Sequence, residues 1–151
     1  MIKVDNIYQI VQNKILGSNL FIVDISIDNN NNIKIKLDSN KGINIDECVE
    51  VSKYVEKNLN KDVEDFKLEV SSPGLNQPFM VIDQYKKNIG KNLILISNEG
   101  ERITGKLIKV KTTEIELETN NNIISKKETS VLKKVLINFD KIKSAKIKLS
   151  F

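Results

Sequence analysis

One short segment, Ser71-Ser72-Pro73-Gly74-Leu75-Asn76-Gln77-Pro78, separates two halves of the sequence that follow different hydrophobic patterns, and it contains both prolines of the chain. Before it, apolar residues recur at helical spacing or alternate in short runs. After it, helical spacing soon disappears and short alternating runs follow one another. A chain of 151 residues can form two small domains. We therefore expect a domain at residues 1–74, a linker with a short helical stretch at 75–90, and a second domain at 91–151.

The proline-glycine segment predicts a particular turn as well as a boundary. Proline fixes φ at the second position of a tight turn, and glycine accepts the positive φ of the third, so we expect a type II turn over residues 72–75. We also expect the four junction residues to set the geometry between the domains. They are Ser71, Ser72, Pro73 and Gly74.

The first half predicts an α+β domain. Apolar residues at helical spacing indicate a helix ending near Gly17 and a second one capped by Asn44 and Glu47. Alternating runs indicate a strand around Phe21, a strand beyond the asparagine turn at residues 29–32, and a third before Ser71. We expect a three-stranded sheet with both helices on one face. The buried positions that we expect are Val4, Ile7, Tyr8, Val11, Ile15, Phe21, Val23, Ile25, Ile27, Ile33, Ile35, Leu37, Cys48, Val51, Val55, Leu59, Phe66, Leu68 and Val70.

The second half predicts a small β-barrel of the SH3-like or Sm-like kind. Short alternating runs start at Leu93, Ile103, Ile115, Ile123, Val135 and Ala145, at a spacing of roughly ten residues. The alternation changes phase at Ile108, which indicates a bulge. Turns are expected at residues 98–100 and 120–122, and one helical turn is expected near residues 140–143.

Charge divides the chain at the same place. Residues 1–75 carry 9 Lys against 12 Asp and Glu, whereas residues 76–151 carry 14 Lys and one Arg against 8 acids. A basic domain favours an anionic partner such as RNA. A general bias toward Lys, Asn and Ile explains the same counts, so both explanations stay open. The candidate contact residues for an anion are Arg102, Lys106, Lys109, Lys111, Lys141, Lys143 and Lys146.

The composition argues against catalysis, cofactors and metal binding. The chain has no histidine and a single cysteine, so it lacks the usual zinc ligands and the usual base for a nucleophile. Ser71 and Ser72 are expected at a strand end rather than in a catalytic group, and no phosphate-binding glycine loop is present. The acidic cluster of Asp62, Glu64 and Asp65 lacks the pattern of a calcium loop. With no signal peptide and no apolar run of about 20 residues, we expect a cytoplasmic protein.

The segment Phe66 to Phe79 closely resembles the domain-junction signature of the ribosome maturation factor RimP family. Further along the chain, the second predicted helix, Gly105-Lys106-Leu107 and Ile142-Lys143-Ser144-Ala145 fall where landmarks of that family would lie. Asn76 and Gln77 depart from the family, which commonly has Asp and Arg there, so these positions lack the usual charges.

The resemblance implies a cytoplasmic, non-enzymatic bacterial factor without a cofactor. It implies an amino-terminal α/β domain, an SH3-like barrel, and binding to the immature small ribosomal subunit. Through that family the expected partners are ribosomal RNA and a small-subunit protein near the decoding centre, whose incorporation it would assist. We expect a monomer and no membrane partner. Two alternatives stay open: a general Sm-like RNA-binding module, and an enzyme that uses Ser71 or Ser72.

Overall fold

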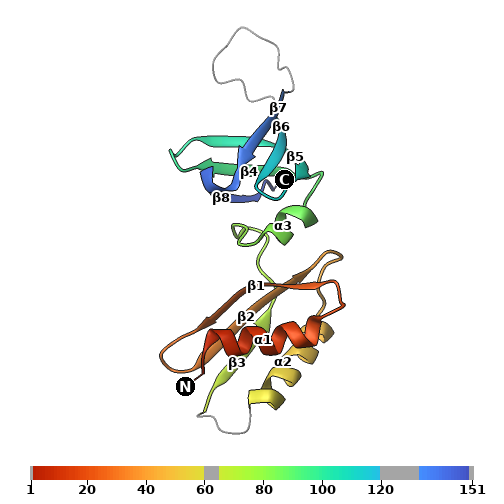
Figure 1. Ribbon diagram of the computed structural model, residues 1–151, viewed down its shortest axis with the longest axis vertical. Helices are drawn as coiled ribbons and strands as arrows, with labels where there is room; N and C mark the ends of the chain where they lie inside the picture. Colours follow the sequence, from red (N-terminus) through yellow and green to blue (C-terminus); the bar gives the residue numbers. More distant parts are fainter. Residues whose placement is uncertain (1, 60–64, 120–132, 150–151) are drawn as a thin grey trace. The chain divides into compact units, whose positions relative to one another are not determined.

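The computed structural model describes residues 2–59, 65–119 and 133–149, and the chain divides into two compact units (Figure 1). Unit 1 is Met1–Pro73 and unit 2 is Gly74–Phe151. Each unit has its own hydrophobic core, and the two cores share no residue. The predicted strand at Ile123 and Ile124, the turn at residues 120–122, and Asp62 and Glu64 lie outside the described residues.

Unit 1 is a three-stranded sheet with two helices on one face (Figure 1). Its strands lie in the order β1-β2-β3, with β1 antiparallel and β3 parallel to β2. The parallel pairing follows from the crossover through α2, which returns the chain in its original direction. The predicted α+β class and the single helical layer are confirmed. The elements are α1 (Val4–Ile15), β1 (Leu20–Ile27), β2 (Asn32–Ser39), α2 (Ile45–Leu59) and β3 (Lys67–Ser71).

The helix cap and the two turns that the sequence predicts in unit 1 are present in the structure. The Asn44 side chain accepts a hydrogen bond from the Glu47 N–H at 2.8 Å, and Glu47 accepts one from the Asn44 N–H at 3.1 Å. This is the reciprocal cap expected at the start of α2. Gly17 has a φ of 81° just after α1, and Asn31 has a φ of 60° in the asparagine turn. These three predictions are confirmed.

Three predicted core positions on the helices of unit 1 are wrong. Val4 and Tyr8 are 43% and 42% exposed, because the sheet covers only the narrower stripe of Ile7, Val11 and Ile15. In α2, Val51, Val55 and Leu59 are buried as expected, but Cys48 is half-buried and outside the core cluster. Ile43 packs on the core near that end of the helix instead.

The expected alternation of β1 is also wrong in its first half. The pairing of β1 with β2 shifts register between Ile22 and Asp24, so Val23 is an inserted residue. A bulge of one residue moves every side chain on one side of it to the opposite face. Leu20 and Ile22 therefore face the core before the bulge, and Ile25 and Ile27 after it. The inserted Val23 is buried as predicted, with 5% of its surface exposed, but like the half-buried Phe21 it is not part of the core cluster.

Unit 2 is a five-stranded antiparallel sheet in the order β7-β6-β5-β4-β8, in which the last strand returns beside the first. No pairing joins β7 to β8 among the described strands, which leaves these two at the edges. The predicted bulge at Ile108 is confirmed by a register shift between Leu107 and Lys109. The elements are α3 (Ile82–Lys87), β4 (Asn92–Ser97), β5 (Arg102–Val110), β6 (Glu114–Thr119), β7 (Lys133–Asn138), a 3-10 turn η1 (Phe139–Lys141) and β8 (Ile142–Ile147).

The core of unit 2 includes a residue from the segment that the sequence predicts as a linker. Tyr85 in α3 is 8% exposed and belongs to the same cluster as Leu93, Leu107 and Ala145. The Phe79 N–H donates to the Ala145 carbonyl at 2.7 Å, so residues 75–90 include anchored positions. Gly105 permits a close strand contact, because a Cβ there would lie 2.9 Å from the Glu118 carbonyl oxygen.

Candidate functional site

The predicted junction residues lie at the end of unit 1 and the start of unit 2. Ser71 is the last residue of β3 and is paired with Lys36 of β2, and the boundary between units falls after Pro73. The predicted type II turn over residues 72–75 is wrong, since the φ of Gly74 is not in the positive region that this turn requires. The chain turns later, where the Gln77 N–H donates to the Gly74 carbonyl at 3.1 Å.

A cavity in unit 1 brings Ser71 and Ser72 close to the start of α2. Its volume is about 380 Å³. Burial raises the pKa of the Cys48 thiol, and the nearby Glu47 carboxylate raises it further, so the thiol stays protonated at neutral pH. None of the described residues around this cavity is a Lys, His, Asp or Glu that could act as a base. The lining residues are Ile43, Asn44, Ile45, Cys48, Val49, Ser52, Val70, Ser71 and Ser72.

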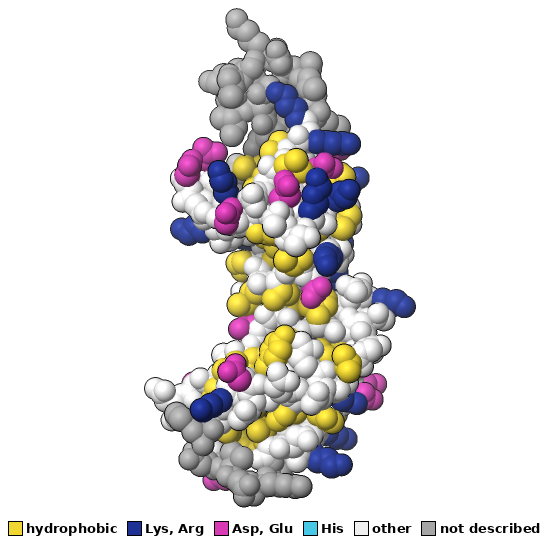
Figure 2. Space-filling view, viewed as in Figure 1, with side chains coloured by type: hydrophobic (Ala, Val, Ile, Leu, Met, Phe, Trp, Pro, Cys, Tyr) yellow, Lys and Arg dark blue, Asp and Glu magenta, His cyan; other side chains and the backbone are white. Residues whose placement is uncertain are grey.

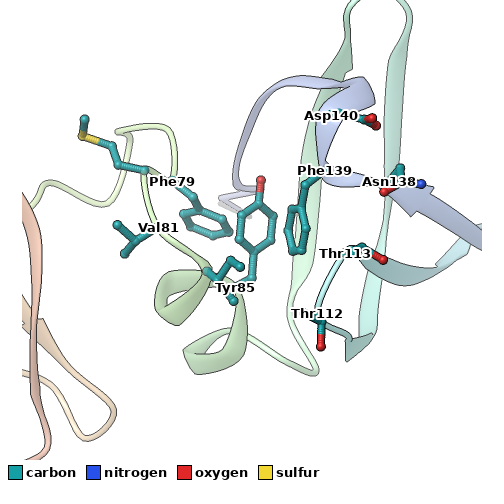
Figure 3. A pocket seen from close by; sticks show the side chains of 10 residues that line it. Phe79, Val81, Tyr85, Thr112, Thr113, Asn138, Phe139 and Asp140 are labelled. Atoms are coloured by element: carbon teal, nitrogen blue, oxygen red, sulfur yellow. The ribbon is translucent and has the colours of Figure 1, made fainter.

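A second cavity, in unit 2, lies beside an aromatic cluster that sequence reasoning missed. Figure 3 shows the Tyr85 ring between the rings of Phe79 and Phe139. The ring centroids are 4.9 Å and 5.1 Å apart, and both contacts are edge-to-face. Thr112, Thr113, Asn138 and Asp140 line the other side of this cavity, whose volume is about 530 Å³.

Burial raises the pKa of Tyr85 to about 12, so its hydroxyl stays protonated at neutral pH. The three rings come from α3, from the segment before it and from η1, and they hold these elements against the sheet. No local pattern could have revealed the cluster, since Phe139 is more than 50 residues from Tyr85 in the sequence. The buried Tyr85 ring contacts both other rings edge-to-face, so the cluster contributes to the packing of unit 2.

All seven candidate contact residues for an anion are exposed, and they lie on two strands and in two turns. Arg102, Lys106 and Lys109 are in β5, and Lys111 follows that strand. Lys141 is in η1, and Lys143 and Lys146 are in β8. Strand β4 lies between β5 and β8, so the two groups flank an uncharged strand and do not form one continuous patch.

The β5 lysines face carboxylates on the neighbouring strand, which the sequence pattern did not reveal. Lys106 is the register partner of Glu118, and Lys109 is the register partner of Glu116. Both pairs lie on the outer face, because Leu107 and Leu117 between them are buried. Opposite charges directly across two strands attract each other and partly cancel. On the face seen in Figure 2, basic and acidic side chains are accordingly intermingled over the β-rich unit.

The described part of the chain has neither a cluster of metal ligands nor a helix suited to span a membrane. No group of three His, Cys, Asp or Glu residues in the described ranges could hold a metal ion. Within those ranges, none of the helices combines the length and the apolar character required to span a bilayer.

Comparison with known proteins relates this sequence to one family, and the relatives given below all have the same name. A sequence-family model, the RimP N-terminal domain, matches residues 10–76. Three relatives, each called ribosome maturation factor RimP, are similar over most of both units. The one from Christiangramia forsetii is 34% identical over 89% of this chain and 90% of its own. The one from Porphyromonas gingivalis is 37% identical over 78% of each chain, and the one from Flavobacterium psychrophilum is 33% identical over 85% and 82%.

Proposed function

This chain belongs to the RimP family of ribosome maturation factors, and we propose that it binds the immature small ribosomal subunit and assists its assembly. The proposal includes help in the incorporation of a small-subunit ribosomal protein near the decoding centre. The observation that carries it is the likeness to the Christiangramia forsetii factor, which covers 90% of that relative and therefore extends over both units.

The chemistry of the cavity in unit 1 argues against a catalytic role for Ser71, Ser72 and Cys48. Ser71 and Ser72 have no base beside them among the described residues that line their cavity, and the Cys48 thiol is held protonated. A nucleophile needs a neighbouring base or a lowered pKa. We propose that the protein is not an enzyme, needs no cofactor and acts in the cytoplasm as a monomer.

The residues that would make the contacts are proposed in two groups. The first group would set the geometry with which the two units bind the same target, and it consists of Ser71, Ser72, Pro73 and Gly74. The exposed basic residues of unit 2 would contact ribosomal RNA through its phosphates, which positions a protein without reading sequence. The excess of positive charge in residues 76–151 also favours a second candidate, a general RNA-binding module of the Sm-like type.

Sedimentation with ribosomal particles tests the proposal. Cells that lack the protein should accumulate unfinished small subunits, and the purified protein should sediment with those particles more than with mature ones. Normal subunit profiles without the protein would contradict the assembly role. A ring-shaped oligomer that binds free RNA and ignores subunits would instead support the second candidate.

A further inference from the structure

The basic residues of unit 2 differ in how far they lie from carboxylates. Lys106 and Lys109 each have a glutamate as register partner on β6. Neighbouring strands are about 5 Å apart, so these opposite charges lie well within the Debye length of about 8 Å at physiological ionic strength. The positive field around each β5 lysine is therefore reduced by a carboxylate on the neighbouring strand.

Among the described strands, no carboxylate is the register partner of a lysine of β8, and the nearest acid in the sequence is Asp140 in η1, three residues before Lys143. Lys146 is paired with Ile94, and the Lys148 N–H donates to the Asn92 carbonyl at 2.8 Å, which continues the same ladder. Strand β4 (Asn92–Ser97) contains no Asp or Glu, and neither does β8 itself. Along the sheet, β6 with its glutamates is three strand spacings from β8, or about 14 Å, which exceeds the Debye length.

The other side of β8 is uncharged too. The Phe79 N–H donates to the Ala145 carbonyl at 2.7 Å, so the segment before α3 lies along this edge. Residues 75–82 contain no charged side chain. Ala145 and Ile147 face the core, which places Lys146, and Lys148 two residues on, on the outer face. Lys143, also exposed, falls at the register shift between Ile96 and Ser97 and has no partner on β4.

We propose that Lys143, Lys146 and Lys148, here called the β8 basic stripe, form the surface of unit 2 that binds the phosphate backbone of RNA. This inference rests on the proposed function and deepens it by choosing among the candidate residues. The lysines of β5 contribute less because the negative charges of Glu116 and Glu118 lie opposite them on β6 and reduce the positive field there. The stripe positions RNA without reading its sequence, since the described aromatic rings of unit 2 pack against one another. Lys148 was not among the residues singled out from the sequence.

Two double variants that each remove two positive charges distinguish the contribution of the β8 basic stripe to RNA binding from that of β5. In the full-length protein, Lys146→Gln with Lys148→Gln removes two charges from the β8 basic stripe, and Lys106→Gln with Lys109→Gln removes two from β5. The probe is an RNA hairpin of about 20 base pairs and arbitrary sequence, with affinity measured by fluorescence anisotropy between about 50 and 200 mM KCl. Circular dichroism checks that both variants are folded.

The β8 variant should lower the slope of log affinity against log salt by about 2, or about 1 for each lost phosphate contact. The β5 variant should lower it by less than half as much. Adding Glu116→Gln and Glu118→Gln to the wild type should raise the affinity, because it removes the negative charges opposite Lys106 and Lys109. A second hairpin of different sequence should give the same ranking.

Three results would overturn the inference. The first is an equal loss in the two double variants, and the second is failure of the wild type to bind the hairpin. The third is a β8 variant that keeps its RNA affinity and self-associates, because lysines on an edge strand also block pairing between sheets. Co-sedimentation of the wild type with small subunits is measured in parallel. If it is retained while the hairpin does not bind, the inference falls and the proposed function stands.

Discussion

The two units bury their cores by different routes. Unit 1 lays two amphipathic helices on one face of a mixed sheet, so most of its core residues belong to elements with a clear period. Unit 2 has an antiparallel sheet whose last strand returns beside its first, and it completes the core with rings from α3 and η1. Unit 1 thus depends on local periodicity and unit 2 on contacts between distant segments. Substitutions that act on one core and spare the other test this difference.

The largest expected effect comes from truncating one buried side chain in the core of either unit. Ile35 lies in the central strand of unit 1 with no exposed surface, so Ile35→Ala should lower the free energy of unfolding by about 2–5 kcal/mol. Leu117→Ala is the matched change in unit 2, where Leu117 is equally buried. Hydrogen exchange followed by mass spectrometry in urea should show each variant destabilising its own unit. Equal loss of protection in both units after either change would mean that the cores are not separate.

A smaller effect is expected at the close strand contact in unit 2. Gly105→Ala places a Cβ at 2.9 Å from the Glu118 carbonyl, so the strands must move apart, at a cost of about 1–3 kcal/mol. Gly74→Ala is the control, because its Cβ would meet only the Gln77 Cγ, at 3.5 Å, without a positive φ. The control should stay within about 0.5 kcal/mol of the wild type in urea denaturation. A larger cost at Gly74 than at Gly105 would contradict the geometry of both sites.

The reciprocal cap of α2 is a local device that stabilises the start of this helix in unit 1. Asn44→Ala removes the acceptor for the Glu47 N–H. It should lower the free energy of unfolding of unit 1, measured by urea denaturation, by about 1 kcal/mol. Asn58→Ala in the same helix removes only an exposed side-chain bond to the Tyr54 carbonyl, so it should cost less. Equal costs would show that the reciprocal cap adds nothing beyond one exposed hydrogen bond.

The smallest expected effect is a pH dependence at the turn between β1 and β2. Hydrogen bonds from the backbone and then the side chain of Asn32 lower the pKa of Asp28 below 3.8. Its stabilising contribution is therefore present above about pH 4 and is lost as the pH falls through the lowered pKa. Asp28→Asn should remove this part of the acid sensitivity in unit 1 and leave unit 2 unchanged. A carboxyl titration by NMR at or above 3.8 would contradict the prediction.

Sequence reasoning succeeded where the deciding interaction is local. The Asn44–Glu47 cap, the left-handed Gly17, the turn at Asn31 and the phase change at Ile108 each depend on neighbours a few residues away. It missed the bulge at Val23, although Val23 is buried as expected, because an apolar residue in an apolar strand gives no sign that it is inserted. It failed at Gly74 too, since the proline-glycine pair permits a type II turn without requiring it.

The candidate site shows the same division. The sequence alone determined that unit 2 is basic, that the chain has no histidine, and that its junction segment resembles that of the RimP family. Only the tertiary structure decided which lysines face a carboxylate. Pairing across strands brings Lys106 to Glu118 and leaves Lys146 beside Ile94. The physical reason is that composition sums charges along the chain, whereas the field at a surface depends on distances that strand register sets.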